Sequence, residues 1–219
     1  MQERGSWFYE VCGALTRLLI WLLSRFEIYG IEHVPRTGPV IFAANHLSNA
    51  DPIIIAAVLP RASVFMAKEE LLRIPGMAWM TKAYGSFTVR RGAADREAIR
   101  RALDVLGEGR ALGLFPEGTR SKSGSLGEPF AGVGMLALRT GATIVPIGIT
   151  GTDDVSPLKV LWRRPRVVLR IGPPIPTVQV TGGLKNVAHE RTERVMSAIA
   201  ALLPEERRGR FIATADAVV

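Results

Sequence analysis

The sequence predicts an α/β fold in which a mixed, largely parallel sheet is flanked by helices. Three observations lead to this prediction. Short β-rich segments alternate with helical segments along most of the chain. GPVIFAAN at 38–45 is a continuous β-rich run, as in a strand buried on both faces. The segment 94–109 gathers its apolar residues on one helical face. Strands that alternate with helices form a sheet with helices on its faces.

The expected elements follow one another in order along the chain. The first strand, FEIYGIEHVP at 26–35, alternates apolar and polar residues and ends at Pro35. Further strands are expected at 38–45, 62–67, 86–89, 111–115, 143–149 and 166–172, and helices at 50–60, 74–85, 94–109, 132–141 and 185–203. Pro204 stops the closing helix, and the residues after Phe211 are expected to fray.

The composition favours a single domain with an anionic partner. The chain has 219 residues, of which 47% are hydrophobic, enough for a sizeable core. Its 28 Lys and Arg against 20 Asp and Glu give a net charge of +8, which suits nucleic acid, an anionic membrane or a phosphorylated substrate. The single cysteine, Cys12, excludes an internal disulfide. The three histidines are far apart and none has zinc-ligand spacing, so we expect no metal site.

Residues 1–25 are expected to form an N-terminal amphipathic, membrane-associated helix, followed by a globular domain at 26–219. Glu10 and Arg17 interrupt the apolar run, whose clean stretches are shorter than the roughly 20 residues of a spanning helix. No small-residue cleavage site follows, which argues against a signal peptide. The aromatic residues would lie at headgroup depth and the arginines would face anionic lipid: Trp7, Tyr9, Trp21, Arg4, Arg17 and Arg25. The alternative is an ordinary helix packed on the domain.

The segment NHLSNADP at 45–52 places His46 and Asp51 on either side of a strand-to-helix loop. Open α/β sheets bind ligands at such loops, at the carboxyl ends of strands. An imidazole is a competent general base once a carboxylate fixes its tautomer and orientation. The chain has no G-x-S-x-G nucleophile elbow, so the pair would activate a substrate hydroxyl or water. Taken alone, the spacing favours a simpler interpretation, in which His46 ends a strand and Asp51 caps a helix.

Two arginine-bearing loops also follow strands. LFPEGTRS at 114–121 enters a turn in which Gly118 can adopt unusual backbone angles, and Arg120 offers a bidentate fork for phosphate. YGSFTVRRG at 84–92 places Arg90 and Arg91 at another strand end. If the strands are neighbours, these loops and His46 converge on one edge of the sheet. Each arginine considered alone would be a solvated surface charge.

In order and spacing, NHLSNADP, GSFTVRR, LFPEGTRS and IVPIGI resemble the glycerolipid acyltransferase family, most closely its lysophosphatidate-acylating members. The resemblance covers about residues 27–175 and implies a glycerophospholipid acyltransferase fold, with 26–219 as the acyltransferase domain. Arg90 matches the family's arginine, with a one-residue ambiguity from Arg91, and Lys68 in FMAKEEL matches a lysine common there. NADP lacks the aromatic residue often found between the histidine and the aspartate, which bears on the choice of acceptor.

The resemblance implies transfer of an acyl group from acyl-CoA or acyl-carrier protein to the sn-2 hydroxyl of lysophosphatidate, giving phosphatidate, with no metal or redox cofactor. His46 would take the hydroxyl proton, and Asp51 would hold the imidazole. Glu117 would orient Arg120 or bind a glycerol hydroxyl, because a carboxylate repels an anion. IVPIGI at 144–149 would shape an acyl channel or form a core strand. The substrate-binding residues would be Lys68, Arg90, Glu117, Gly118, Thr119 and Arg120.

The implied partners are a lysophospholipid acceptor, acyl-CoA or acyl-carrier protein, and an anionic membrane surface. The expected location is the cytoplasmic face of the cell membrane, peripheral or monotopic. WRRPRVVLR at 162–170 and Lys159 would extend the basic membrane face or form a solvated strand edge.

Three alternatives remain: another lysolipid acceptor, a lipid or thioester hydrolase, and a nucleic-acid-binding domain. The phosphate-type loop argues against the hydrolase, because water needs no anion clamp. Aromatic residues are only 7% of the chain, which disfavours nucleic-acid binding.

Overall fold

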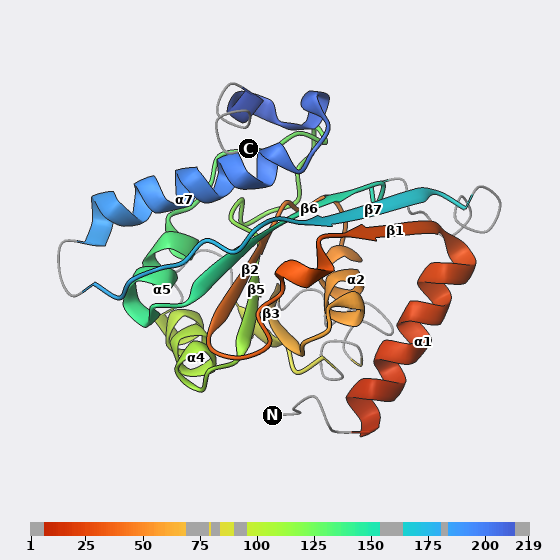
Figure 1. The fold of residues 1–219 in the computed structure, drawn as a ribbon, viewed down its shortest axis with the longest axis horizontal. Helices are drawn as coiled ribbons and strands as arrows, with labels where there is room; N and C mark the ends of the chain where they lie inside the picture. Colours follow the sequence, from red (N-terminus) through yellow and green to blue (C-terminus); the bar gives the residue numbers. More distant parts are fainter. Residues whose placement is uncertain are drawn as a thin grey trace.

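Seven strands form one sheet in the part of the chain that the structure, a computed structural model, describes: residues 7–68, 79, 84–89, 96–153, 164–180 and 184–212. Among these strands only the pair β6 and β7 is antiparallel, and the other neighbours are parallel. The prediction of a mixed, largely parallel sheet is therefore confirmed (Figure 1). Across the sheet the order is β1 (Arg25–Tyr29), β7 (Arg166–Ile171), β6 (Thr143–Thr150), β2 (Val40–Ala44), β5 (Ala111–Leu114), β3 (Ser63–Lys68) and β4 (Phe87–Val89).

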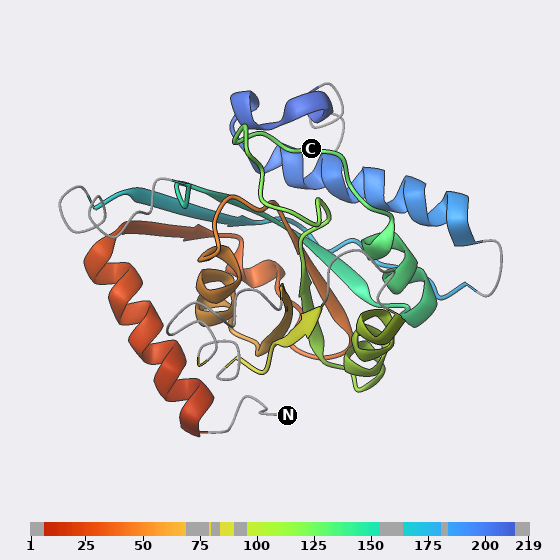
Figure 2. The same cartoon turned by 180° about the vertical axis from the view of Figure 1, so that it is seen from behind.

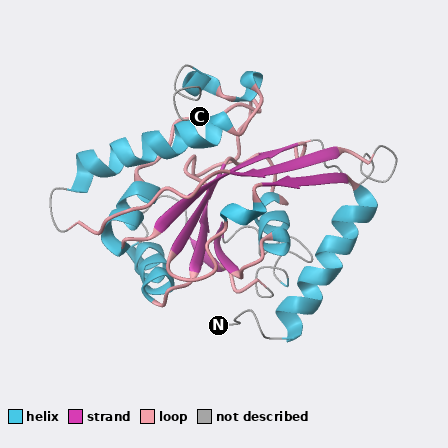
Figure 3. Ribbon diagram, in the orientation of Figure 1, coloured by secondary structure: helices cyan, strands magenta, loops and turns pink. Residues whose placement is uncertain are grey.

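Helices cover both faces of the sheet (Figures 1, 2 and 3). One face carries α1 (Trp7–Leu23) and α2 (Asp51–Val58), and the other carries α4 (Arg96–Gly107), α5 (Gly132–Thr140) and α7 (Leu184–Ala201). Short 3-10 turns follow β1 and α7: η1 (Ile31–His33), η3 (Glu205–Arg207) and η4 (Gly209–Phe211). The helix expected at 74–85 lies outside the described residues, apart from Trp79, Tyr84 and Gly85.

Strand β2 lies at the centre of the sheet and contributes to both halves of the core. Ile41 and Ala43 pack with the α4, α5 and α7 side, whereas Phe42 and Ala44 pack with the α1 and α2 side. All five residues of β2 are buried. The strand has no solvent-facing side, which explains its continuous apolar sequence. Residues 144–149 of β6 are also buried, so IVPIGI is a core strand.

The first strand is shorter than the sequence predicts. β1 ends at Tyr29, and the chain then turns through η1. In this turn Nδ1 of His33 donates a hydrogen bond to the carbonyl of Ile171 at 2.8 Å. The alternation of apolar and polar residues thus continues into a turn that packs on the end of β7.

Helix α1 packs directly on α2. Tyr9 is 4% exposed and donates its hydroxyl to the carbonyl of Ala56 at 3.3 Å, and Nη1 of Arg17 donates to the carbonyl of Ala57 at 2.9 Å. These carbonyls lie in the last turn of α2, where no intrahelical donor is available. The expectation that Tyr9 lies at headgroup depth is therefore wrong, whereas Arg17 stays exposed although one of its N–H groups is bound to α2. Arg4 lies outside the described residues.

Candidate active site

His46 follows β2 at the carboxyl edge of the sheet, and the residue before it fixes the point at which the chain leaves the strand. Asn45 is 3% exposed, and its side chain forms two hydrogen bonds with the backbone of Ile149 in β6. Nδ2 donates to the Ile149 carbonyl at 2.9 Å, and Oδ1 accepts the Ile149 N–H at 2.7 Å. The side chain of Asn45 therefore extends the contact between β2 and β6 beyond the end of the ladder.

The His46 and Asp51 side chains meet, as predicted. Nδ1 of His46 lies 2.8 Å from Oδ2 of Asp51, whose side chain is fully buried. The same oxygen accepts the backbone N–H groups of Leu47 and Ser48, each at 2.7 Å. Because Oδ2 is an acceptor in all three contacts, Nδ1 carries a proton, and in the neutral ring the free lone pair is therefore on Nε2. The imidazole is thus held in the tautomer that a general base needs.

Asp51 is the first residue of α2 and not its N-cap. Ala50 occupies the N-cap position, and no side chain caps the helix. The expected capping role is therefore wrong. The reason is that the Asp51 carboxylate turns back to the two loop N–H groups and to the imidazole.

Phe115 forms the wall on which the imidazole rests. Its ring is stacked on that of His46, with centroids 4.0 Å apart and an interplanar angle of 17°. Phe65 lies behind it, with a centroid distance of 5.8 Å from Phe115. The stacking fixes the ring plane, just as Asp51 fixes the position of Nδ1. This role of Phe115 was not predicted from the sequence, where its only signal is an aromatic residue before PEG in LFPEGTRS.

The loop after β5 meets the loop after β2, so the predicted convergence of these two loops is confirmed. The backbone N–H of Ser121 donates to the carbonyl of His46 at 2.7 Å. Oε1 of Glu117 accepts the backbone N–H of His46 at 3.2 Å. Both backbone polar groups of His46 are therefore bound by one loop. This contact follows from the pairing of β2 with β5.

Glu117 connects the loop after β2 to the loop after β5 through hydrogen bonds. It is 4% exposed, and its second oxygen, Oε2, accepts the backbone N–H of Gly127 at 2.9 Å. Burial raises the pKa of this carboxyl, and the hydrogen bonds from Gly127 and His46 oppose the rise. The sequence suggested that Glu117 orients Arg120 or binds a glycerol hydroxyl. Within the described residues its hydrogen bonds go to backbone amides instead, because the side chain lies beneath the turn and not on its outer face.

The outer face of this turn carries Gly118, Thr119 and Arg120, all exposed. Gly118 has a φ of +63°, and its N–H donates to the carbonyl of Phe115 at 3.0 Å. A side chain here would be strained, and its Cβ would lie 3.0 Å from the ring of Phe130. Glycine therefore lets the turn close tightly while Arg120 remains free to meet a ligand.

The remaining predicted site residues are only partly covered by the structure. Lys68 ends β3 and pairs with Val89 of β4, but its side chain lies outside the described part. Arg90 and Arg91 also lie outside it. Their roles stay predictions, although β4 is parallel to β3 and ends at the edge that carries His46.

An apolar cavity of about 290 Å³ adjoins the site. Phe115 and Gly118 line it together with residues of α4, α5 and neighbouring segments, including Met66, Ile99, Phe130 and Leu136. The imidazole stacks on one ring of this lining. A polar reacting centre therefore adjoins space for an apolar group, and Phe115 borders both.

Among the described residues, no group of three His, Cys, Asp or Glu side chains is placed to hold a metal ion. The chemistry that this part of the site offers is proton transfer at Nε2 of His46, next to an exposed arginine and an apolar cavity.

Comparisons with known proteins identify a family for this chain. Residues 25–150, more than half of the chain, match the family model described as Acyltransferase. The 1-acyl-sn-glycerol-3-phosphate acyltransferase of Borreliella burgdorferi is 32% identical over 64% of this chain and 58% of its own length. The lyso-ornithine lipid O-acyltransferase of Pseudomonas aeruginosa is 32% identical over 68% of this chain and 59% of its own length. The chain thus spans somewhat more than half of these relatives.

A solved structure shares the fold. The crystal structure of the 1-acyl-sn-glycerophosphate acyltransferase from Thermotoga maritima superposes with a TM-score of 0.67 at 27% identity. The superposition covers 85% of this chain and 76% of that one.

Proposed function

This chain belongs to the acyltransferase family, and from that premise we propose that it acylates lysophosphatidate at the sn-2 hydroxyl to give phosphatidate. The observation that carries the proposal is the 2.8 Å contact between Nδ1 of His46 and Oδ2 of Asp51. The donor is an acyl thioester, acyl-CoA or acyl-carrier protein.

In the reaction, Nε2 of His46 takes the proton of the sn-2 hydroxyl while its oxygen attacks the thioester carbon. Asp51 stabilises the positive charge that forms on the ring. The tetrahedral intermediate then collapses, the carbon–sulfur bond breaks, and the thiolate takes the proton from the imidazolium. The protein needs no nucleophile of its own, since the acceptor alcohol supplies it.

The acceptor's phosphate binds at the turn Gly118–Arg120. Arg120 is exposed there, and its guanidinium can form two parallel hydrogen bonds with a phosphate. Ser121, the next residue, is bonded to the backbone of His46, so the turn and the base form one unit. Arg120 is one residue away from this contact, so a phosphate bound to Arg120 would hold the acceptor near His46.

The acyl chain occupies the apolar cavity behind Phe115. Its lining includes Phe115 and Gly118, which connect it to the base and to the phosphate turn. An apolar chain gains free energy by leaving water for such a cavity, about 0.8 kcal/mol per CH₂ group.

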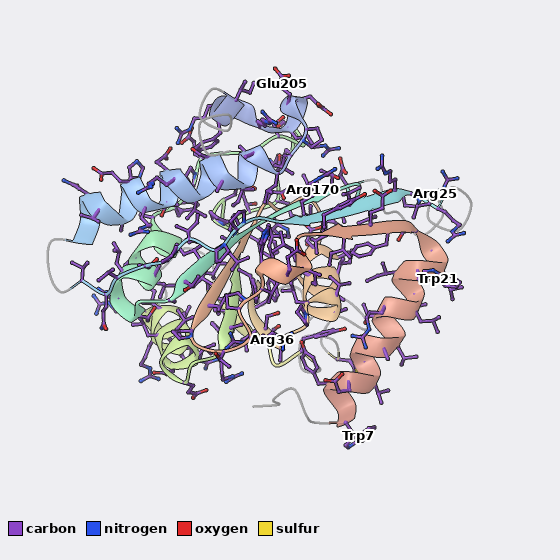
Figure 4. The ribbon with its side chains drawn as sticks, viewed as in Figure 1. Trp7, Trp21, Arg25, Arg36, Arg170 and Glu205 are labelled. Atoms are coloured by element: carbon purple, nitrogen blue, oxygen red, sulfur yellow. The ribbon has the colours of Figure 1, made fainter. Side chains whose placement is uncertain are left out.

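We further propose that α1 lies on the cytoplasmic face of an anionic membrane. Its outer side exposes Trp7, Val11, Leu15, Leu18, Leu19, Trp21 and Leu22. Trp7 lies at one end of α1 and Trp21 lies near the other, and Arg25 follows at the start of β1 (Figure 4). Among the described residues no helix has both the length and the hydropathy to cross a bilayer. The exposed stripe fits a helix lying in the interface, which gives access to membrane-borne lysophosphatidate.

Transfer assays test the proposal. Wild type, His46→Ala and His189→Ala are compared on a panel of lysolipids with both donors. His189 is a matched control because its side chain is 62% exposed on α7. Wild type and His189→Ala should form phosphatidate, and His46→Ala should lose about 10²–10⁴ in kcat.

Other products would contradict specific parts of the proposal. Release of free fatty acid at the same rate with and without lysophosphatidate would indicate a hydrolase. The Pseudomonas aeruginosa relative is named for another acceptor, so preferential acylation of a phosphate-free lysolipid is the second candidate function.

A further inference from the structure

The C-terminal segment after α7 packs on the loop that carries the phosphate turn. η3 and η4 lie at the far end of α7, where Glu205 is labelled in Figure 4. Two hydrogen bonds tie their backbone to this loop. The N–H of Leu126 donates to the carbonyl of Arg207 at 2.9 Å, and Oγ of Ser125 donates to the carbonyl of Glu206 at 3.0 Å. The segment is therefore bound directly to Ser125 and Leu126 of this loop.

The packing in this contact is tight. Leu126 is 7% exposed and lies in the same hydrophobic cluster as Phe211, which is 2% exposed. Gly209 has a φ of +56°, and a Cβ there would lie 2.4 Å from the carbonyl oxygen of Leu126. Only glycine allows this approach.

The side chain of Arg207 connects two loops of the sheet edge. Nη1 donates to the carbonyl of Gly124, in the loop after β5, at 3.3 Å. Nη2 donates to Oδ2 of Asp153, which follows β6, at 2.9 Å. β6 and β5 are the two neighbours of β2. Arg207 therefore joins the loops on either side of the strand that delivers His46.

The loop segment held by Arg207 is connected to His46 at both of its ends. At one end, the N–H of Ser121 bonds to the carbonyl of His46. At the other end, the N–H of Gly127 bonds to Glu117, which in turn accepts the N–H of His46. Displacement of residues 121–127 would move both contacts, and with them the base and the turn that carries Arg120.

We propose that Arg207 is a positioning residue for acyl transfer, which holds the phosphate turn over His46 by joining Gly124 to Asp153. This inference rests on the proposed function for its kinetic consequences. A partly exposed ion pair contributes little to global stability. A small displacement of a binding group, in contrast, strongly weakens use of the substrate that this group holds. The effect of Arg207 should therefore appear in acceptor use and not in the melting temperature.

The test compares Arg207→Met, Arg207→Lys and Asp153→Asn with Arg191→Met. Arg191 is a matched control, since it is a half-buried arginine like Arg207 and donates to one carbonyl, that of Pro176, at 3.1 Å. For Arg207→Met we expect KM for lysophosphatidate to rise about tenfold while KM for the acyl donor changes less than about twofold. Arg207→Lys should recover part of the loss, and Asp153→Asn should show a smaller rise. A double mutant, Arg207→Met with Asp153→Asn, should lose no more than Arg207→Met alone.

A second measurement does not depend on activity. Hydrogen exchange at the amides of Leu126 and Gly127 should be faster in Arg207→Met and unchanged in Arg191→Met. If wild type makes no phosphatidate, the proposed function fails, and exchange still tests whether Arg207 holds the loop. If Arg207→Met does not fold, Asp153→Asn gives the same comparison. Unchanged exchange together with unchanged KM for the acceptor, or equal effects in Arg191→Met, would overturn the proposal.

Discussion

The carboxylate of Glu117 accepts the backbone N–H of His46 at 3.2 Å, although the two residues are 71 positions apart. Its other oxygen accepts the N–H of Gly127. The acidic residue of the turn thus lies beneath the site as a brace, while Arg120 stays exposed on the outer face. The turn has an inner residue that is bound to the backbone of His46 and an outer residue that is exposed.

Replacement of Asp51 separates its two tasks. In Asp51→Asn the amide oxygen can still accept the N–H groups of Leu47 and Ser48, so the loop should keep its shape. The ring would lose the charge that stabilises the imidazolium, and kcat should fall by about 10²–10⁴. Steady-state kinetics with lysophosphatidate measure this loss.

Asp51→Ala should add a loss of stability. The two loop N–H groups would be left without an acceptor, which costs about 1–3 kcal/mol. Urea unfolding of both variants measures the difference. Wild-type turnover in Asp51→Asn, or equal stability of the two variants, would rule out this division of roles.

Glu117→Gln should change how stability depends on pH. Burial raises the pKa of Glu117 above its ordinary value of 4.5, so above pH 4.5 the unfolded chain loses this proton before the folded chain does. The folded state then holds more protons, and the contribution of Glu117 to stability falls as pH rises through the raised pKa. Glutamine does not titrate. The free energy of unfolding of wild type, measured relative to Glu117→Gln, should therefore decrease with pH.

Urea unfolding of wild type and Glu117→Gln from about pH 4 to about pH 8 measures this difference in the free energy of unfolding. The contributions of the other titratable groups are nearly the same in both proteins and largely cancel. A difference that increases with pH would mean that hydrogen bonding outweighs burial at this carboxyl.

Arg120→Ala should weaken use of phosphorylated acceptors selectively. Loss of a charge-assisted hydrogen bond should raise KM for lysophosphatidate about ten- to a hundredfold. KM for monoacylglycerol, which has no phosphate, should stay near the wild-type value. Arg139→Ala is the matched control, because Arg139 is also exposed but lies at the C-terminal end of α5. An equal loss with both acceptors would exclude a phosphate clamp.

Charge on the exposed face of α1 should impair membrane binding. Leu18 is 50% exposed, and Leu18→Glu should lower the affinity for anionic vesicles at least about tenfold, because an apolar contact is replaced by a charge. Val187→Glu is the control, since Val187 is 44% exposed on α7. Vesicle sedimentation gives both affinities. Equal binding by the two variants would indicate that α1 is only a packing helix.

Local sequence was sufficient to predict the strands and helices and the contact between His46 and Asp51. β2 is buried on both faces, so every residue of the strand is apolar, and this unbroken apolar run can be seen in the sequence. His46 and Asp51 are close enough in sequence for one loop to bring them together. The glycine at 118 marks a backbone turn, since its φ is positive.

The sequence by itself therefore determined the α/β fold, the meeting of His46 with Asp51, and the turn at 118–120. Only the tertiary structure decided that Tyr9 and Arg17 bind the end of α2, that Phe115 supports the imidazole, and that Glu117 faces inward. Periodicity shows that a residue is apolar or charged, but not which partner it contacts. Those partners come from strand order, because placing β6 and β5 on either side of β2 joins segments that are remote in the chain.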